Sequence, residues 1–154
     1  MAITAAQHID ANRRTINSNE AIVKESTWTF VTTTTGAVGA HTLFTLTDNA
    51  LVSVFGICDT NLTGAATIEV GVAGNTAGLL AQIADATDLD DGENWVDATP
   101  EVGVSTIPST FVLNDGANII LTIGSTAVTA GVIDFYCLYR PLNDNSDIEV
   151  TTPA

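Results

Sequence analysis

The sequence has very few basic residues and very little cysteine. Four lysines and arginines stand against 18 aspartates and glutamates in 154 residues, which gives a formal net charge of −14. A chain of this charge is repelled by nucleic acid and by anionic membranes, so we expect neither as a partner. The two cysteines, Cys58 and Cys137, are too few for a disulfide scaffold. Both lie in apolar, strand-like runs, and we expect buried free thiols, with one bridge between them as the alternative.

Long hydrophobic runs are also missing. No stretch approaches the roughly 18 consecutive apolar residues that a membrane-spanning helix requires. The first residues, MAITAAQHIDANRR, do not place a basic region ahead of an apolar one, so we expect no signal peptide. Apolar residues nevertheless make up 45% of the chain, which is enough for a folded core. A chain of 154 residues fits one domain that buries roughly 70% of its unfolded surface.

The motifs of common catalytic and metal sites are missing as well. The two histidines, His8 and His41, form no His-x-His or His-Glu-x-x-His pattern, so a transition-metal site has no support. A Ser-His-Asp triad would have to use His41, but no Gly-x-Ser-x-Gly motif is present, and the cysteines lack the electropositive setting of a nucleophile. The glycine-rich run GVAGNTAG, 71–78, lacks the lysine of a phosphate-binding loop. We therefore expect no enzyme activity and no cofactor.

What is abundant is acid, concentrated in DATDLDDGENWVDATPE, residues 85–101. This stretch holds seven acids and no base. An EF-hand calcium loop does not fit, because placing Gly92 at its sixth position leaves leucine at the third and alanine at the twelfth. A weaker calcium site, built from Asp88, Asp90 and Asp91, is an alternative. A glycosidase pair has little support, because it needs a carboxyl in a dry pocket. We favour a solvated anionic loop that ends in a buried Trp95.

From Trp28 onward the sequence shows short strand-like runs separated by turn signals. The runs are TWTFVTTTT, HTLFTLT (41–47), LVSVFGIC (51–58), TIEVGV (67–72), LLAQIA (79–84), FVL (111–113), NIILTIG (118–124) and VIDFYCLYR (132–140). The run LVSVFGIC is almost continuously apolar, which predicts a strand buried on both faces. Eight or nine strands without a convincing helix predict an all-β fold, an antiparallel β-sandwich of the jelly-roll type. A lectin-like or immunoglobulin-like sandwich is the alternative.

Charge and pattern divide the chain into three segments. Residues 1–26 have no net charge and widely spaced isoleucines, and we expect an extended or partly helical arm, with a weak helix over residues 4–14. Residues 27–142 are predicted to form the β-sandwich body. Residues 143–154 are predicted to be a loose, polar C-terminal tail. Body and tail together hold one base, Arg140, and 15 acids, so almost the whole negative charge lies outside the arm.

Three stretches resemble small proteins encoded among the structural genes of tailed bacteriophages and prophages. They are HTLFTLTDNALVSVFGICDTNLTGAATIEVGVAGNTAGLLAQ, WVDATP and GANIILTIGSTAVTAGVIDFYCLYRPL. The likeness covers about residues 41–142 and carries no catalytic or metal-binding residues. It implies a virion component. An acidic β body with a neutral arm also suits a capsid decoration, or cement, protein, a class that looks like small β domains clustered on the outer shell, often as trimers.

The decoration interpretation implies the major capsid protein as partner, a homotrimer, and a place on the outer capsid surface of a virion assembled in the host bacterial cytoplasm. The arm would lie across neighbouring capsid subunits, burying its isoleucines while its arginines bind carboxylates. The residues expected to contact the capsid are Ile3, Ile9, Arg13, Arg14, Ile16 and Ile22.

Two other functions remain as alternatives. One is a virion protein of the tail, neck or fibre. The other is a carbohydrate-binding β-sandwich module, in which Trp28, Trp95, Tyr136 and Tyr139 would form a stacking platform. Aromatic residues in strands are more often buried in the core, because they bury large areas there, and we expect these four in the core.

Overall fold

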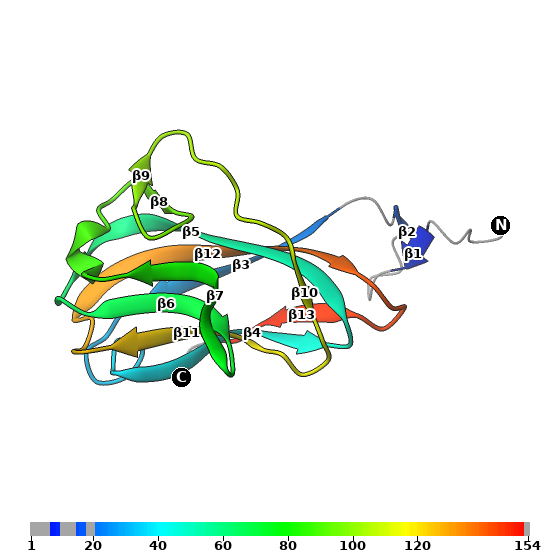
Figure 1. Ribbon diagram of the computed structural model, residues 1–154, viewed down its shortest axis with the longest axis horizontal. Helices are drawn as coiled ribbons and strands as arrows, with labels where there is room; N and C mark the ends of the chain where they lie inside the picture. Colours follow the sequence, from blue (N-terminus) through cyan, green and yellow to red (C-terminus); the bar gives the residue numbers. More distant parts are fainter. Residues whose placement is uncertain (1–6, 10–14, 18–20, 153–154) are drawn as a thin grey trace.

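Two antiparallel sheets pack face to face as a β-sandwich (Figure 1), which confirms the predicted fold class. The computed structural model describes residues 7–9, 15–17 and 21–152, with side chains from residue 21 onward. The six-stranded sheet has the order β3 (Ile22–Thr29), β12 (Ala130–Pro141), β5 (Ala50–Thr63), β8 (Glu93–Trp95) and β9 (Glu101–Val102), and β10 (Phe111–Leu113) also pairs with β5. The five-stranded sheet has the order β13 (Asp147–Val150), β4 (Gly39–Thr47), β11 (Ile119–Gly124), β6 (Thr67–Val72) and β7 (Asn75–Ile83). A short 3-10 helix, η1 (Ala86–Asp88), follows β7.

The strand pairing is that of a jelly roll. Strands pair from the outside of the chain inward: β3 with β12, β4 with β11, β5 with β8 and β10, and β6 with β7. Such nested pairing allows one long antiparallel ribbon to fold over into two facing sheets. β13 extends the five-stranded sheet by pairing with β4.

The core lies between the sheets and follows the two-residue period of the strands. In β11, Ile119, Leu121 and Ile123 are all buried, and the residues between them are not. β4 departs from this alternation, because the neighbours Leu43 and Phe44 are both buried. The register between β4 and β11 shifts at this point, so a bulge turns both side chains inward.

β5 is buried on one face and only partly covered on the other. Its inward residues Val52, Val54 and Cys58 are buried, whereas the outward residues Phe55 and Ile57 are half-buried. The prediction of a strand buried on both faces is therefore wrong for the outward face. That face is where other segments of the chain cross the sheet.

The body extends further at both ends than the sequence predicts. β3 begins at Ile22, inside the segment assigned to the arm, and pairs with β12 along its whole length. The tail 143–154, predicted to be loose, contains β13, whose Ile148 is fully buried. β3 reads IVKESTWT, with four polar or charged residues in succession, and β13 has only four residues, two of them acids, so neither gives a clear strand signal in the sequence.

A polar link joins the two sheets at one end of the sandwich. Tyr139 of β12 donates its hydroxyl hydrogen to Asp147 Oδ1 of β13 at 2.7 Å. Lys24 Nζ of β3 lies 3.7 Å from the same oxygen. Burial, followed by the bond to Asp147, raises the pKa of Tyr139 above its usual range, so the phenol stays protonated and donates. The link therefore ties both β12 and β3 to the opposite sheet.

Two short strands of the N-terminal segment form a sheet of their own. β1 (Gln7–Ile9) pairs antiparallel with β2 (Thr15–Asn17), and neither joins the sandwich sheets. Figure 1 shows this hairpin beyond the start of β3. The weak helix expected over residues 4–14 is therefore wrong for the strand residues 7–9, and its other residues lie outside the described chain.

Candidate functional site

Three carboxylates of the acidic loop, residues 85–101, accept hydrogen bonds from N–H groups of the loop itself: those of Asp85, Glu93 and Asp97. Asp85 Oδ1 accepts hydrogen bonds from the backbone N–H and the hydroxyl of Thr87 at 3.0 and 2.7 Å. These bonds, the hydroxyl first, hold the pKa of Asp85 below its usual range. Asp97 Oδ1 accepts from the Thr99 N–H at 2.7 Å. Asp85 and Asp97 therefore supply acceptors for N–H groups where the chain turns.

Asn61 of β5 holds the middle of this loop. Its amide group donates to Asp90 Oδ1 at 2.8 Å, and its side-chain oxygen accepts from the Asp91 N–H at 2.7 Å. Glu93 Oε2 accepts from the Asp90 N–H at 2.8 Å. Backbone bonds from Leu62 N to the Leu89 carbonyl and from Gly92 N to the Cys58 carbonyl also join the loop to β5. The side chain that adds to them is the neutral Asn61 and not a cation.

The acidic loop shows no grouping of ligands for a metal. Across residues 21–152, no three His, Cys, Asp or Glu side chains are placed so that they could hold a metal ion. Asp88, Asp90 and Asp91, the residues of the calcium alternative, do not form such a group. The loop ends in Trp95, which is fully buried as predicted and donates from Nε1 to the Ala81 carbonyl at 3.1 Å.

The two cysteines and His41 are held by contacts within the fold and form no catalytic grouping with one another. Cys58 and Cys137 are buried free thiols, as predicted, and the alternative of a bridge is wrong. Burial raises their pKa values to about 11 and about 12, so both stay protonated at neutral pH. His41 donates from Nε2 to the Ala37 carbonyl at 2.8 Å, and its ring lies edge-on to Trp28 with 5.8 Å between centroids.

Three of the four aromatic residues considered for a carbohydrate platform lie in the core, as predicted. They are Trp28, Trp95 and Tyr139. Tyr136 does not follow the prediction, because it lies half-buried on the outer face of the six-stranded sheet. Its ring stacks on Phe55 with 5.2 Å between centroids and 17° between planes. Its hydroxyl donates to Glu25 Oε1 at 3.2 Å.

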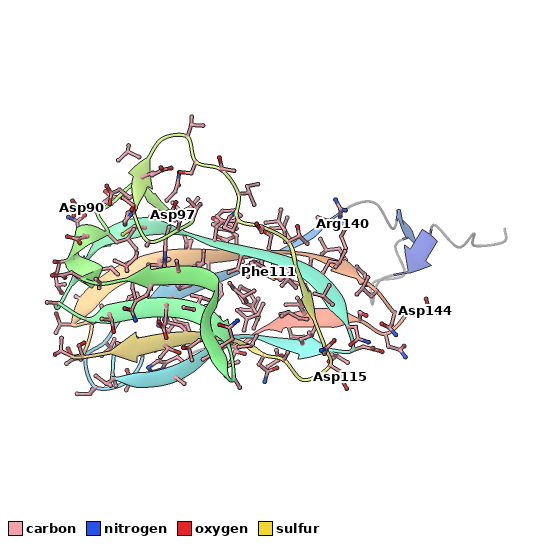
Figure 2. All side chains as sticks on the ribbon, in the orientation of Figure 1. Asp90, Asp97, Phe111, Asp115, Arg140 and Asp144 are labelled. Carbon is pink, nitrogen blue, oxygen red and sulfur yellow. The ribbon has the colours of Figure 1, made fainter. Side chains whose placement is uncertain are left out.

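The connection from β9 to β10 forms a surface that we call the apolar ledge. The ledge is the segment 102–112 with its exposed side chains Val102, Val104, Ile107 and Val112. Figure 1 shows the connection arching away from the sheet after β9 and then descending across the sandwich to β10. In Figure 2 side chains project outward along this arch. Apolar side chains therefore point into solvent in a segment that the sequence marks only as a long connection.

A pocket of about 270 Å³ lies beside the apolar ledge. It is lined by Phe55, Asn94, Val96, Gly103, Val104, Ser105 and Ile107. Sequence reasoning missed both the pocket and the ledge. One signal marks them: the run VGVSTIPSTFVLN, between Glu101 and Asp115, has no charged residue in a chain with 18 acids.

The residues predicted to contact a capsid are only partly described. Ile3, Arg13 and Arg14 lie outside the described residues, and the structure places none of them. Ile9 belongs to β1 and Ile16 to β2. Ile22 begins β3 and packs against the core. The Ile22 side chain is therefore partly used in packing the body, and only the rest of it is open to another contact.

No protein-family model, curated protein or solved structure matches the chain. Among the residues that the structure describes, no helix is long and apolar enough to cross a membrane. A functional assignment therefore rests on the jelly-roll body, the arm, and the chemistry of the exposed surfaces.

Proposed function

We propose that the protein is a structural component of a tailed-bacteriophage virion, a decoration (cement) protein that binds the outer capsid shell and stabilises it. The observation that carries the proposal is the division of the chain. Almost all of its negative charge lies on a closed jelly-roll body, while the hairpin β1–β2 stands outside the sheets of that body. The resemblance of residues 41–142 to phage virion proteins supports the same function.

The arm offers the chemistry that the body has little of. Arg13 and Arg14 are two of the four basic residues of the chain, and Ile9 and Ile16 lie in its two strands. An isolated two-stranded hairpin is marginally stable in water, so it gains stability by lying on a partner surface. Isoleucines would bury against the shell while the arginines pair with its carboxylates. Repetition of this contact around a trimer would turn weak single attachments into a lasting one.

An outer position agrees with the charge of the body. Packaged DNA would repel a body of this charge, whereas the outer surface of a shell places it in solvent. The partner is then the major capsid protein. The protein would join the virion in the cytoplasm of the host bacterium, where the shell is assembled.

The deciding measurement is the copy number of the protein in purified virions, relative to the major capsid protein. A copy number comparable with that of the major capsid protein supports decoration. A few dozen copies or fewer would instead favour the tail, neck or fibre. Absence from virions would reject both assignments.

Binding to purified shells tests the arm. Deletion of residues 1–20 leaves β3 whole, whereas a cut after residue 26 would remove residues that pair with β12. We expect the 1–20 deletion to abolish binding while the circular dichroism of the body is unchanged. In the full chain, Arg14→Glu should weaken binding more than Arg140→Glu, which is the matched charge reversal on the body. Undiminished binding by the deletion variant would contradict the role of the arm.

A second candidate function is carbohydrate binding, favoured by the Phe55–Tyr136 stack on the outer sheet face. Aromatic rings with hydrogen-bonding groups beside them suit sugar rings, and Glu25 is bonded to the Tyr136 hydroxyl. A glycan array tests this candidate. Binding by the natural chain that is lost in Tyr136→Ala would support it, and an array without binding would reject it.

A further inference from the structure

The middle of the apolar ledge, residues 104–109, is exposed backbone that lacks the bonds of a strand or a turn. These residues belong to no strand or helix, and within the described part of the chain none of their backbone N–H groups donates a hydrogen bond. None of the six residues is buried, and Val104 is 95% exposed. Exposed connections of this kind are where proteases preferentially cut a folded chain.

Only a few side-chain bonds hold this stretch against the body. Asn94 of β8 donates from Nδ2 to the Gly103 carbonyl at 3.3 Å and to Ser105 Oγ at 3.0 Å. Ser53 of β5 donates from Oγ to the Pro108 carbonyl at 2.9 Å. Each such bond contributes about 1 kcal/mol. The stretch can therefore open locally, as a protease requires, at a free energy well below that of unfolding the body.

Exposure alone does not distinguish the ledge from the other connections. Val38, between β3 and β4, is also 58% exposed. The turn before it is bonded along its backbone, however, because the N–H groups of Thr34 and Gly36 both donate to the Val31 carbonyl, at 3.0 and 2.8 Å. Ala37 N–H donates to the Thr34 carbonyl at 3.2 Å. What sets the ledge apart is exposure together with a backbone that has no such bonds.

The side chains of the ledge select the class of protease. Val104 is a small aliphatic residue followed by Ser105, whereas Ile107 is followed by Pro108, which has no N–H group and crowds the residue before it. An endopeptidase with a small apolar pocket, such as an elastase, fits Val104, whereas trypsin needs a basic residue. The matching bond is therefore the one between Val104 and Ser105.

We propose that the Val104–Ser105 peptide bond is a processing site for an endopeptidase that accepts small aliphatic residues, and that the cleaved chain remains one folded body. Water adds to the Val104 carbonyl carbon, and the bond from that carbon to the Ser105 nitrogen breaks. At neutral pH the products are a carboxylate on Val104 and an ammonium group on Ser105. The proposal does not rest on the proposed function, because neither the exposure of the bond nor the strand order involves a capsid.

The strand order explains why the two fragments would stay together. Cleavage gives fragments 1–104 and 105–154, and the second contains β10, β11, β12 and β13. β12 lies between β3 and β5 of the first fragment, and β11 lies between β4 and β6. Separation would break both sheets internally and expose core residues such as Leu121 and Phe135, which are fully buried.

Limited digestion of the folded full chain with an elastase, followed by mass spectrometry, tests the position of the cut. Between residues 21 and 152, we expect the first cut at Val104–Ser105 and none beside Val31 or Val38. Val104→Asp should slow this cut about tenfold or more, because a charge would have to enter an apolar pocket. Val38→Asp is the matched control and should leave the rate unchanged. Digestion of the urea-unfolded chain shows which other bonds the enzyme accepts.

Size-exclusion chromatography of the cleaved protein tests whether the fragments stay together. We expect elution with the intact 16.0 kDa chain, and separation into two fragments only in denaturant. The Tm of the cleaved protein should rise with protein concentration, because its unfolding releases two molecules.

Four results would overturn the proposal. The first is a folded chain that stays uncut at Val104–Ser105, or is cut first beside Val31 or Val38, while the unfolded chain is digested. The second is a cut that Val104→Asp does not slow. The third is a rate that rises with urea in proportion to the unfolded fraction, since the bond would then be reached only by global unfolding. The fourth is separation of the fragments without denaturant. All four are measured without capsids, so they are independent of the shell-binding experiment.

Discussion

Two consecutive connections, the acidic loop and the apolar ledge, use the same kinds of residue in opposite ways. The acidic loop carries seven acids, yet its apolar residues Ala86, Leu89 and Trp95 are fully buried. The ledge carries no charge, yet its valines are largely exposed. Figure 2 shows Asp90 and Asp97 at the surface of the acidic loop, near the start of the arch.

The difference lies in which groups fasten each connection to the body. In the acidic loop the side chains of Leu89 and Trp95 enter the core. The Asn61 side chain forms hydrogen bonds with Asp90 and Asp91, in the turn between them. In the ledge the fastening groups are the carbonyls of Gly103 and Pro108 and the hydroxyl of Ser105. The average hydropathy of a loop therefore does not tell which of its residues face the core.

Trp95→Ala should have the largest effect on stability, because it removes the main apolar anchor of the acidic loop. Trp95 is fully buried, lies edge-on to Phe135 with 6.0 Å between centroids, and is bonded to the Ala81 carbonyl. We expect the free energy of unfolding to fall by about 3–5 kcal/mol, as measured by urea denaturation. Trp95→Phe keeps part of the volume and should cost less. Equal stability of Trp95→Ala and the natural chain would show that the loop is not anchored there.

Asn61→Ala should have the next largest effect. The substitution removes both side-chain hydrogen bonds from β5 to the turn at Asp90 and Asp91. We expect the free energy of unfolding to fall by about 1–2 kcal/mol, since each exposed bond contributes modestly. Asn114→Ala, at an exposed asparagine in the turn after β10, is the matched control and should change little. If Asn114→Ala lowered the free energy of unfolding as much as Asn61→Ala, the two hydrogen bonds of Asn61 would not explain the loss.

A smaller effect concerns pH and Asp85. Its pKa is lowered in the folded chain, so the bonds from Thr87 stabilise the fold above the unfolded pKa. This contribution begins to be lost near the ordinary value of 3.8 and disappears as pH falls through the folded pKa. Thr87→Val should raise the pKa of Asp85 in an NMR titration, whereas Thr99→Val should not. An unchanged titration in Thr87→Val would assign the shift to another cause.

Val104→Asp should have the smallest effect on stability. Its side chain is already 95% exposed, so the free energy of unfolding of the monomer should stay within about 0.5 kcal/mol. Leu113→Ala, at a buried position just beyond the ledge, serves as the destabilising control. A large loss in Val104→Asp would mean that the ledge packs inward. The contrast with the acidic loop would then vanish.

The sequence predicts most strands because alternation and turn residues are local signals. β6 at 67–72 and β10 at 111–113 have the predicted bounds. β12 extends the predicted run 132–140 by a few residues. The jelly-roll assignment also follows, since the number of strands and their uneven connections limit the choice of fold.

Strands that depend on distant partners escape this kind of prediction. β13 contains Asp147 and Glu149, and only its pairing with β4 reveals that Ile148 enters the core. The N-terminal half of β3 is similar, because its register with β12 is set by residues more than 100 positions away. Local composition carries no trace of such pairing.

Some features of the candidate site can be predicted from neighbouring residues in the sequence, and others depend on contacts with distant residues. Tyr136 and Tyr139 are three residues apart on one strand, so the two-residue period alone places them on opposite faces. The prediction that placed both tyrosines in the core did not use this signal. The exposure of Val104 has no comparable signal, because it depends on where Asn94 and Ser53 fasten the connection.

Because the arm continues directly into β3, the resistance of the protein to a pull on the arm depends on the direction of that pull. β3 pairs with β12 through eight consecutive residue pairs, from Ile22 to Thr29. Tension applied to the arm along the strand would load all of these pairs together, in shear. Tension applied across the sheet would peel them from Ile22 one at a time. The direction of pull, rather than the number of hydrogen bonds, would set how much force the attachment withstands.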